Sequence, residues 1–208
     1  MKQLQIGILA LQGDVEENIS ATNLALKEVG IEGKAVPVKY ADEIAKIDGL
    51  ILPGGESTVI GTLAKLSGAT QVIKDRISDG MPVLGSCAGM IMLSKRAYDK
   101  VVGETKQQLL NVLDIVVERN AFGRQNYSFE AHLNIPLIGT EKFMGVFIRA
   151  PIVTETKDGV DILTTLNNRI VAVKQGTVIG TSFHPELSGD IRVHGYFVHL
   201  VEGYTKST

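Results

Sequence analysis

The first half of the chain alternates short apolar runs with segments whose apolar residues recur at helical spacing. The continuous apolar run at 4–11 contains β-branched residues and predicts a strand that is covered on both faces. From Val15 to Val29 the apolar positions fall on one helical face, and Gly30 closes the segment. Further strands are predicted at 35–38, 49–52 and the start of 83–93, with helical patterns at 63–66 and 72–77. This alternation predicts a parallel sheet with right-handed crossovers.

After about residue 112 the pattern changes to strands with little helix between them. Strand-like segments lie at 112–118, 128–135, 143–148, 160–166, 169–173 and 178–183, and residues 174–177 (KQGT) predict a hairpin turn. A final helix is predicted at about 191–204. The expected fold class is therefore α/β, with a mostly parallel central sheet flanked by helices and an antiparallel or mixed strand region before the C-terminal helix.

Composition narrows the class of protein without naming a function. A length of 208 residues suits one domain, and we expect residues 1–208 to form it. The net charge of −2 gives no electrostatic reason to expect nucleic acid or an acidic membrane surface. A single cysteine excludes an internal disulfide and any multi-cysteine metal site. No stretch is apolar over the length of a membrane span, and no signal-peptide pattern precedes the first strand, so we expect a cytoplasmic protein.

The stretch 83–93 carries the most informative motif of the chain. It predicts a buried strand, a very tight turn and an apolar helix, with Gly85 and Gly89 flanking Cys87 in the spacing G-x-C-x-G. This is the cysteine counterpart of the nucleophile elbow, in which a strained turn lifts the nucleophile above a sheet. The alternative is a buried cysteine that acts as a small hydrophobe.

Nucleophilic cysteine chemistry needs a base and a group that orients the base. The best candidates are His184 and Glu186, two residues apart at the end of the last strand. In an extended chain such residues point the same way, and Pro185 fixes the backbone between them. Alone, such a pair is a weak signal, because a histidine at a strand end is more often a solvated polar group.

Acyl chemistry also needs donors for a developing oxyanion. The amide of Ala88, which follows the cysteine, is one candidate. The second is the glycine-rich turn at 53–57, since loops at the carboxyl ends of parallel strands converge on one crevice. The turn lacks the spacing of phosphate-binding loops. Its alternative role is a plain helix N-terminus capped by Ser57 or Thr58.

Three motifs in this order, PGGEST at 53–58, GSCAGM at 85–90 and SFHPEL at 182–187, resemble the class I (triad-type) glutamine amidotransferases. Within that class, LQG at 11–13, VERNAFGRQ at 117–125 and VFIRAP at 146–151 resemble the glutaminase subunit of pyridoxal 5′-phosphate synthase. The similarity covers nearly the whole chain. It is weakest at 96–108, and nothing functional is carried over there.

The resemblance implies a flavodoxin-like fold and an enzyme that hydrolyses glutamine to glutamate and ammonia. Cys87 would attack the side-chain amide, and the glutamyl thioester would be hydrolysed with the help of His184 and Glu186. The family's oxyanion donors match Gly55 and Ala88. Its glutamine-binding positions match Gly55, Glu56, Ser57, Arg119, Ile148 and Arg149. The sequence leaves open which arginine meets the substrate carboxylate.

The resemblance also implies a protein partner and no cofactor. In this family the glutaminase docks on a (β/α)8-barrel synthase subunit, which uses the ammonia to build pyridoxal phosphate for vitamin B6 biosynthesis. Gln12 resembles a family residue near the docking surface, where it would couple docking to the oxyanion turn; the alternative is a simple turn glutamine. We expect no metal, because His132, His194 and His199 lack ligand spacing.

Two other classes of function stay open from the sequence. One is a cysteine hydrolase of the same architecture that acts on another amide or peptide. The other is a non-catalytic regulatory subunit that only binds a synthase, although the intact triad positions argue against it.

Overall fold

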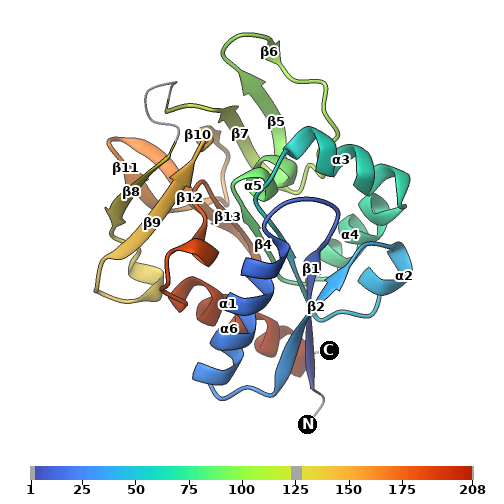
Figure 1. Cartoon of the computed structure of the whole chain (residues 1–208). Coiled ribbons are helices and arrows are strands. Elements are labelled where there is room, and N and C mark those ends of the chain that lie inside the picture. The colour runs from blue at the N-terminus through green and yellow to red at the C-terminus, as the bar shows by residue number, and fades with distance from the viewer. Residues whose placement is uncertain (1–2, 123–127, 208) are drawn as a thin grey trace.

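The computed structural model of the chain describes residues 3–122 and 128–207 and has an α/β architecture (Figure 1). Neighbouring parallel strands form its centre, in the order β2 (Gly33–Val38), β1 (Leu4–Leu9), β3 (Gly49–Leu52), β4 (Val83–Ser86) and β13 (Val178–Thr181). Every residue of β3, β4 and β13 is buried. The predicted parallel sheet, covered on both faces, is therefore confirmed.

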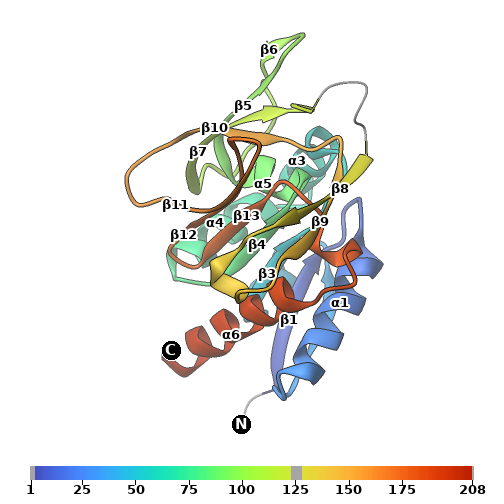
Figure 2. The same ribbon diagram turned by 90° about the vertical axis from the view of Figure 1, so that its left-hand side faces the viewer.

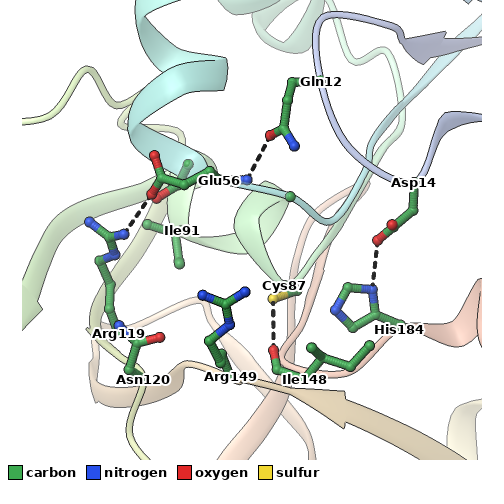
Figure 3. A pocket seen from close by; sticks show the side chains of 12 residues that line it. Gln12, Asp14, Glu56, Cys87, Ile91, Arg119, Asn120, Ile148, Arg149 and His184 are labelled. Atoms are coloured by element: carbon green, nitrogen blue, oxygen red, sulfur yellow. Dashed lines mark hydrogen bonds and ion pairs between the residues drawn. The ribbon is translucent and has the colours of Figure 1, made fainter. Parts of the chain in front are cut away.

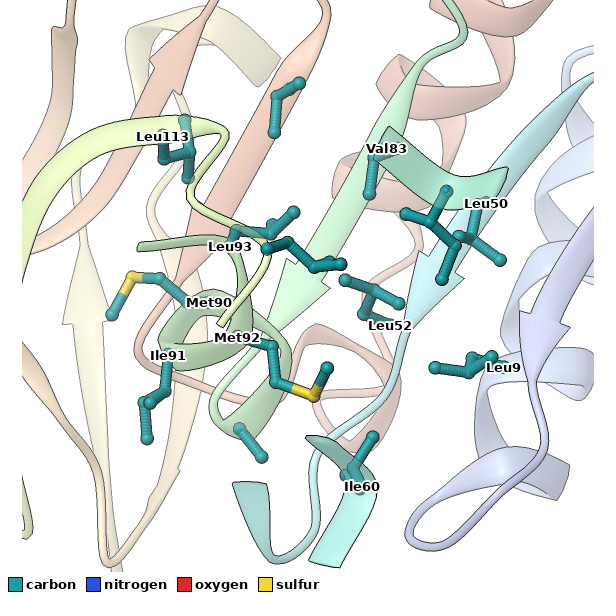
Figure 4. Packing of buried hydrophobic residues seen from close by; sticks show 14 of the residues in the cluster. Leu9, Leu50, Leu52, Ile60, Val83, Met90, Ile91, Met92, Leu93 and Leu113 are labelled. Atoms are coloured by element: carbon teal, nitrogen blue, oxygen red, sulfur yellow. The ribbon is translucent and has the colours of Figure 1, made fainter. Parts of the chain in front are cut away.

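Helices cover the two faces of this parallel core. On one face lie α1 (Val15–Glu28) and α6 (Arg192–Ser207); on the other lie α2 (Ala41–Ile44), α3 (Ser57–Leu66), α4 (Ala69–Ser78) and α5 (Ala88–Leu93). Strand side chains alternate between the faces, so Leu50 and Leu52 belong to the apolar cluster on the face of α2 to α5 (Figure 4), whereas Ile51 belongs to the cluster on the face of α1 and α6. Two apolar layers thus hold the sheet in place and leave its carboxyl edge open.

Beyond β13 the sheet continues mainly with antiparallel pairs. The order is β12 (Arg169–Gln175), β10 (Ile152–Thr156), β7 (Leu113–Arg119), β5 (Ser94–Asp99) and β6 (Gly103–Glu104), with β11 (Asp161–Leu166) paired to β12. Only β5 and β7 in this part of the described chain are parallel. The predicted antiparallel or mixed region before the C-terminal helix is confirmed.

A separate ribbon of β8 (Ser128–Leu133) and β9 (Phe143–Ile148) lies on the α1 and α6 face of the main sheet (Figure 2). Phe143 and Phe147 of this ribbon contact Phe183, with ring centroids 5.6 and 5.7 Å apart. Two short 3-10 turns, η1 (Pro136–Ile138) and η2 (Pro185–Leu187), complete the fold. The ribbon thereby brings the end of β9 to the segment that follows β13.

Some sequence predictions differ from the structure in extent. The first strand ends at Leu9 rather than at 11, and the last strand ends at Thr181 rather than at 183. The hairpin at 174–177 is confirmed, with Gln175 paired to Val178 around Gly176, whose φ is +58°. α2, β5, β6 and β10 were not predicted. In β5 (SKRAYD) Lys95 and Arg96 are exposed and precede the buried Ala97, so the strand depends on pairing with β7 rather than on its own apolar pattern.

None of the helices in the described ranges is long and apolar enough to cross a membrane. The end of the VERNAFGRQ motif, from Gly123 to Gln125, lies outside the described residues.

Candidate active site

The carboxyl edge of the sheet carries a cavity of about 330 Å³, large enough for an amino acid. Loops after β1, β3, β4, β7, β9 and β13 all contribute to it, as expected for an open α/β sheet (Figure 3). Most of the predicted site residues share this lining with three that were not predicted, Asp14, Ile91 and Asn120. The lining consists of Gln12, Asp14, Gly55, Glu56, Ser57, Cys87, Ile91, Arg119, Asn120, Ile148, Arg149 and His184.

Cys87 occupies the strained turn between β4 and α5. Its φ of +48° lies in the left-handed region, which an L-residue adopts at a cost. A Cβ at Gly85 would lie 2.7 Å from the carbonyl carbon of Gly89, and one at Gly89 would collide with the carbonyl oxygen of Leu52. Both glycines are therefore required by the packing of the elbow. Cys87 as a residue is 7% exposed, and its Sγ lies 3.8 Å from the carbonyl oxygen of Ile148, to which the protonated thiol can donate.

His184 reaches the same cavity from the segment after β13. Its backbone N–H donates to the carbonyl of Val146 in β9 at 2.8 Å, which fixes the residue against the ribbon. The ring lies beside the Cys87 sulfur in Figure 3, and its buried Nε2 has no hydrogen-bond partner among the described residues. The pair is thus adjacent without a formed hydrogen bond, as is common in unliganded active sites.

Glu186 holds the other side of the imidazole. Its Oε1 lies 2.9 Å from His184 Nδ1, and its side chain is fully buried. The extended geometry expected for 184–186 is wrong, because Pro185 begins the 3-10 turn η2 and Glu186 lies inside that turn. The turn, rather than strand alternation, brings the carboxylate back to the ring.

A second carboxylate, that of Asp14, contacts the same nitrogen. Its Oδ2 lies 3.1 Å from His184 Nδ1. Burial alone lowers the pKa of His184, but interactions with Asp14, Cys87 and Glu186 outweigh it and raise that pKa to about 12. The imidazole is therefore protonated at neutral pH. Asp14 directly follows Gln12-Gly13 in the loop after a parallel strand, and this position could have indicated from the sequence that Asp14 lies near the site.

The glycine-rich turn after β3 is held by the loop after β1. The N–H of Glu56 donates to Gln12 Oε1 at 2.7 Å, and the N–H of Asp14 donates to the carbonyl of Gly54 at 3.1 Å. Because a trans peptide has its C=O and N–H on opposite sides, the Gly55 N–H points away from Asp14. Ala88, at the start of α5, is buried and does not line the cavity.

The turn also starts a helix, as the alternative interpretation expected, but with a different cap. Glu56, not Ser57 or Thr58, accepts the hydrogen bond of Val59 N–H at 3.1 Å. Burial raises the pKa of Glu56, but hydrogen bonds from the Thr58 hydroxyl and the Val59 amide and the charge of Arg119 lower it overall. Glu56 is therefore an anion at neutral pH.

Arg119 and Glu56 form an ion pair at the cavity wall, 2.7 Å from Nη2 to Oε1. Gln107 Oε1 accepts from Arg119 Nη1 at 3.1 Å and from the Ser57 hydroxyl at 3.2 Å. Gln107 lies in the segment where no function was carried over, and no local pattern pointed to it. Arg149, at the end of β9, has a φ of +44° and lies between Arg119 and Cys87 in Figure 3.

Within the described ranges one set of acidic and imidazole atoms is close enough to hold a metal ion, namely Asp14, His184 and Glu186. These atoms already contact one another, so we assign no metal to them. His194 is fully buried between α1 and α6, with Nε2 3.4 Å from Asn18 Oδ1, and burial lowers its pKa to about 4. It is a neutral packing residue.

Known proteins resemble this chain over nearly its whole length. The model of the SNO glutamine amidotransferase family matches residues 8–203. A pyridoxal 5′-phosphate synthase subunit PdxT of Nitrosopumilus maritimus is 51% identical over 95% of this chain and 97% of its own. The subunit of the same name from Pyrococcus abyssi is 47% identical over 94% of this chain and 98% of its own.

Solved structures support the fold as well. The crystal structure of a glutamine amidotransferase superposes with a TM-score of 0.82 at 43% identity, covering 95% of this chain and 98% of the other. PurLQS from Thermotoga maritima has a TM-score of 0.66 at 16% identity, over 99% of this chain and 100% of that one, a likeness of fold alone.

Proposed function

The chain belongs to the SNO glutamine amidotransferase family, and on that premise we propose that Cys87, His184 and Glu186 form the catalytic triad of a glutaminase. The enzyme is the glutaminase subunit of a pyridoxal 5′-phosphate synthase and hydrolyses glutamine for vitamin B6 biosynthesis. The observation that carries the triad is the placement of Cys87 and His184 on one cavity, with Glu186 on the far ring nitrogen.

In the proposed reaction the Cys87 sulfur attacks the side-chain amide carbon of glutamine. An imidazolium beside the sulfur favours thiolate, and the strained turn presents it to the cavity. The tetrahedral intermediate collapses with cleavage of the C–N bond, and His184 gives its proton to the departing nitrogen, which leaves as ammonia. Neutral His184 then takes a proton from water, the hydroxide attacks the thioester, and glutamate and the thiolate are released.

The proposed donors to the oxyanion are the backbone amides of Gly55 and Ala88. Gly55 lines the cavity, and Ala88 follows the nucleophile in the elbow. The loop after β1 holds two successive peptides of this turn: the Asp14 N–H donates to the carbonyl of the Gly54–Gly55 peptide, and Gln12 Oε1 accepts from the N–H of the Gly55–Glu56 peptide. We therefore assign Gln12 the role of coupling partner docking to the oxyanion turn.

The ion pair of Glu56 and Arg119 suits the zwitterionic end of glutamine. An anion and a cation 2.7 Å apart present complementary charges to an ammonium and a carboxylate on the same carbon. We assign the ammonium to Glu56 and the carboxylate to Arg119, with Ser57, Ile148 and Arg149 completing the pocket.

By family, the chain works with a synthase subunit and uses glutamine as its substrate. We propose that this partner is a (β/α)8 barrel that docks over the carboxyl edge. Because free ammonia is protonated and lost in water, a sealed passage between the two active sites is part of the proposal. We also propose that the 208 residues work as one domain, in the cytoplasm and without a cofactor.

The test is labelling of the single cysteine by a reactive glutamine analogue such as 6-diazo-5-oxonorleucine, with the synthase subunit present. We expect stoichiometric modification of Cys87, located by peptide mapping, and protection by glutamine but not by small peptides. Protection by peptides alone would instead indicate a cysteine hydrolase with another substrate. No labelling would indicate a non-catalytic subunit.

A further inference from the structure

The side chain of Asp14 contacts His184 rather than the first turn of its own helix, α1. It is the N-cap residue of α1, where an aspartate normally accepts from an amide of the first helical turn. Here its side chain makes no such cap and its Oδ2 instead lies 3.1 Å from His184 Nδ1. The carboxylate has thus turned away from the helix and toward the active site (Figure 3).

The backbone around Asp14 holds it in this position. Its N–H donates to the carbonyl of Gly54, and its own carbonyl accepts from Asn18 Nδ2 at 2.8 Å. Asn18 is fully buried beside His194, so this anchor belongs to the packed α1–α6 interface. A Cβ at Gly54 would lie 2.6 Å from Asp14 Oδ2 and 2.7 Å from His184 Nδ1. The turn therefore needs a glycine where the carboxylate meets the ring.

We propose that Asp14 is a second positioning carboxylate for His184, one that shares the Nδ1 proton with Glu186 and stabilises the imidazolium. The two acceptors lie 2.9 and 3.1 Å from one nitrogen that carries one proton. Glu186 is fully buried, whereas the Asp14 side chain is 34% exposed and belongs to the loop that also holds the Gly54–Glu56 turn. Asp14 thus connects the protonation of His184 to the loop after β1, which also carries Gln12, the residue assigned to partner coupling.

Other charged groups lie near the ring but make no carboxylate contact with it. Cys87 is adjacent to the ring, and the cavity walls from the other elements carry Glu56, Arg119 and Arg149. Only Asp14 and Glu186, in the part of the chain that the structure describes, have a carboxylate oxygen at ion-pair distance from the imidazole. A change in the His184 titration after loss of one carboxylate therefore reports on that contact.

The test is Asp14→Asn, which keeps the shape and the capping ability of the side chain and removes its charge. The proposal rests on the proposed triad, so the first readout needs no turnover: NMR titration of the His184 ring nitrogens in a Cys87→Ser background. Without the thiolate, which also raises the pKa of His184, the titration reports the two carboxylates. We expect the midpoint to fall by about one pH unit or more in Asp14→Asn.

The second readout is the pH profile of kcat/KM in the enzyme with Cys87 and its synthase. We expect the alkaline limb, where His184 loses its proton, to move to lower pH in Asp14→Asn. Glu17→Gln is the matched control, since Glu17 is an exposed carboxylate in the same first helical turn. It should leave both readouts unchanged. Unchanged midpoints in Asp14→Asn, or an equal shift in Glu17→Gln, would overturn the proposal. An NMR shift in the Asp14→Asn variant, together with no glutaminase activity in the wild-type protein that keeps Cys87, would overturn the triad only.

Discussion

At the scale of single residues, the cavity is organised by ionised side chains that hold each other in place. His184 is an imidazolium between carboxylates, and Glu56 is an anion paired with Arg119. These pairs leave one end of the cavity complementary to a zwitterion and the other end to an acyl group. The proposed pose of glutamine, with its side chain toward Cys87, would match both ends.

The assignment of Glu56 to the substrate ammonium predicts a change in substrate discrimination. In Glu56→Gln, which keeps the cap acceptor of α3, we expect kcat/KM for glutamine to fall about 10- to 100-fold, corresponding to the loss of a charge-assisted hydrogen bond. For glutaramate, an analogue without the α-ammonium, kcat/KM should fall much less in the same variant. Steady-state kinetics with both substrates measures this.

The control for that experiment is Glu43→Gln. Glu43 also accepts backbone hydrogen bonds at a helix start, from Lys39 and Tyr40, but outside the cavity. Equal losses for glutamine and glutaramate in Glu56→Gln would contradict the ammonium assignment and leave only a capping role.

Cys87 and His184 could be predicted as a catalytic pair because their motifs are local, whereas the contacts around them are not local. Asp14 reaches His184 across 170 positions of chain, and Gln107 reaches Arg119 from an irregular segment. Neither contact follows a helix or strand period. Glu186 was predicted from an extended geometry that the structure contradicts, but the 3-10 turn also brings its carboxylate to the ring of His184.

At the scale of elements, the strand–turn–helix units of the first half were predictable because buried parallel strands are continuous apolar runs. The second half was less predictable. β5 and β10 have exposed polar faces and exist through pairing with β7, which is a tertiary effect. The close contact between the loops after β1 and β3 also arises only in the fold.

That contact makes Gly13 sensitive to substitution. A Cβ at Gly13 would collide with the carbonyl oxygen of Gly54, and its φ is +109°. In Gly13→Ala we expect the oxyanion turn to be displaced and kcat to fall about 100-fold or more, comparable to the loss of an oxyanion donor. Glutamate release with the synthase present measures it.

Gly30→Ala is the matched control. Gly30 also has a positive φ, +71°, but a Cβ there meets nothing within 4 Å. Backbone strain should cost Gly30→Ala about 1 kcal/mol of folding free energy, and Gly13→Ala should lose more because its Cβ also displaces Gly54; urea denaturation measures both losses. Only Gly13→Ala should lose activity. Normal kcat in Gly13→Ala would show that the turn does not depend on the loop.

At the scale of the whole molecule, two layers of helices leave the carboxyl edge of the sheet as the place where six loops meet. Gln12 and Asp14 lie on one of these loops, so a partner that docks over this edge reaches the oxyanion turn and the base at once. Such an arrangement lets docking and hydrolysis be coupled without a change of fold.

The proposed triad is tested by the rate of glutamate release with the synthase subunit present, in wild type, Cys87→Ala and His184→Asn. Docking is measured in parallel by analytical ultracentrifugation. We predict that both variants bind the synthase normally and release no glutamate above background. Glutamate release near the wild-type rate in either variant would show that the substituted residue is not catalytic and would contradict the triad.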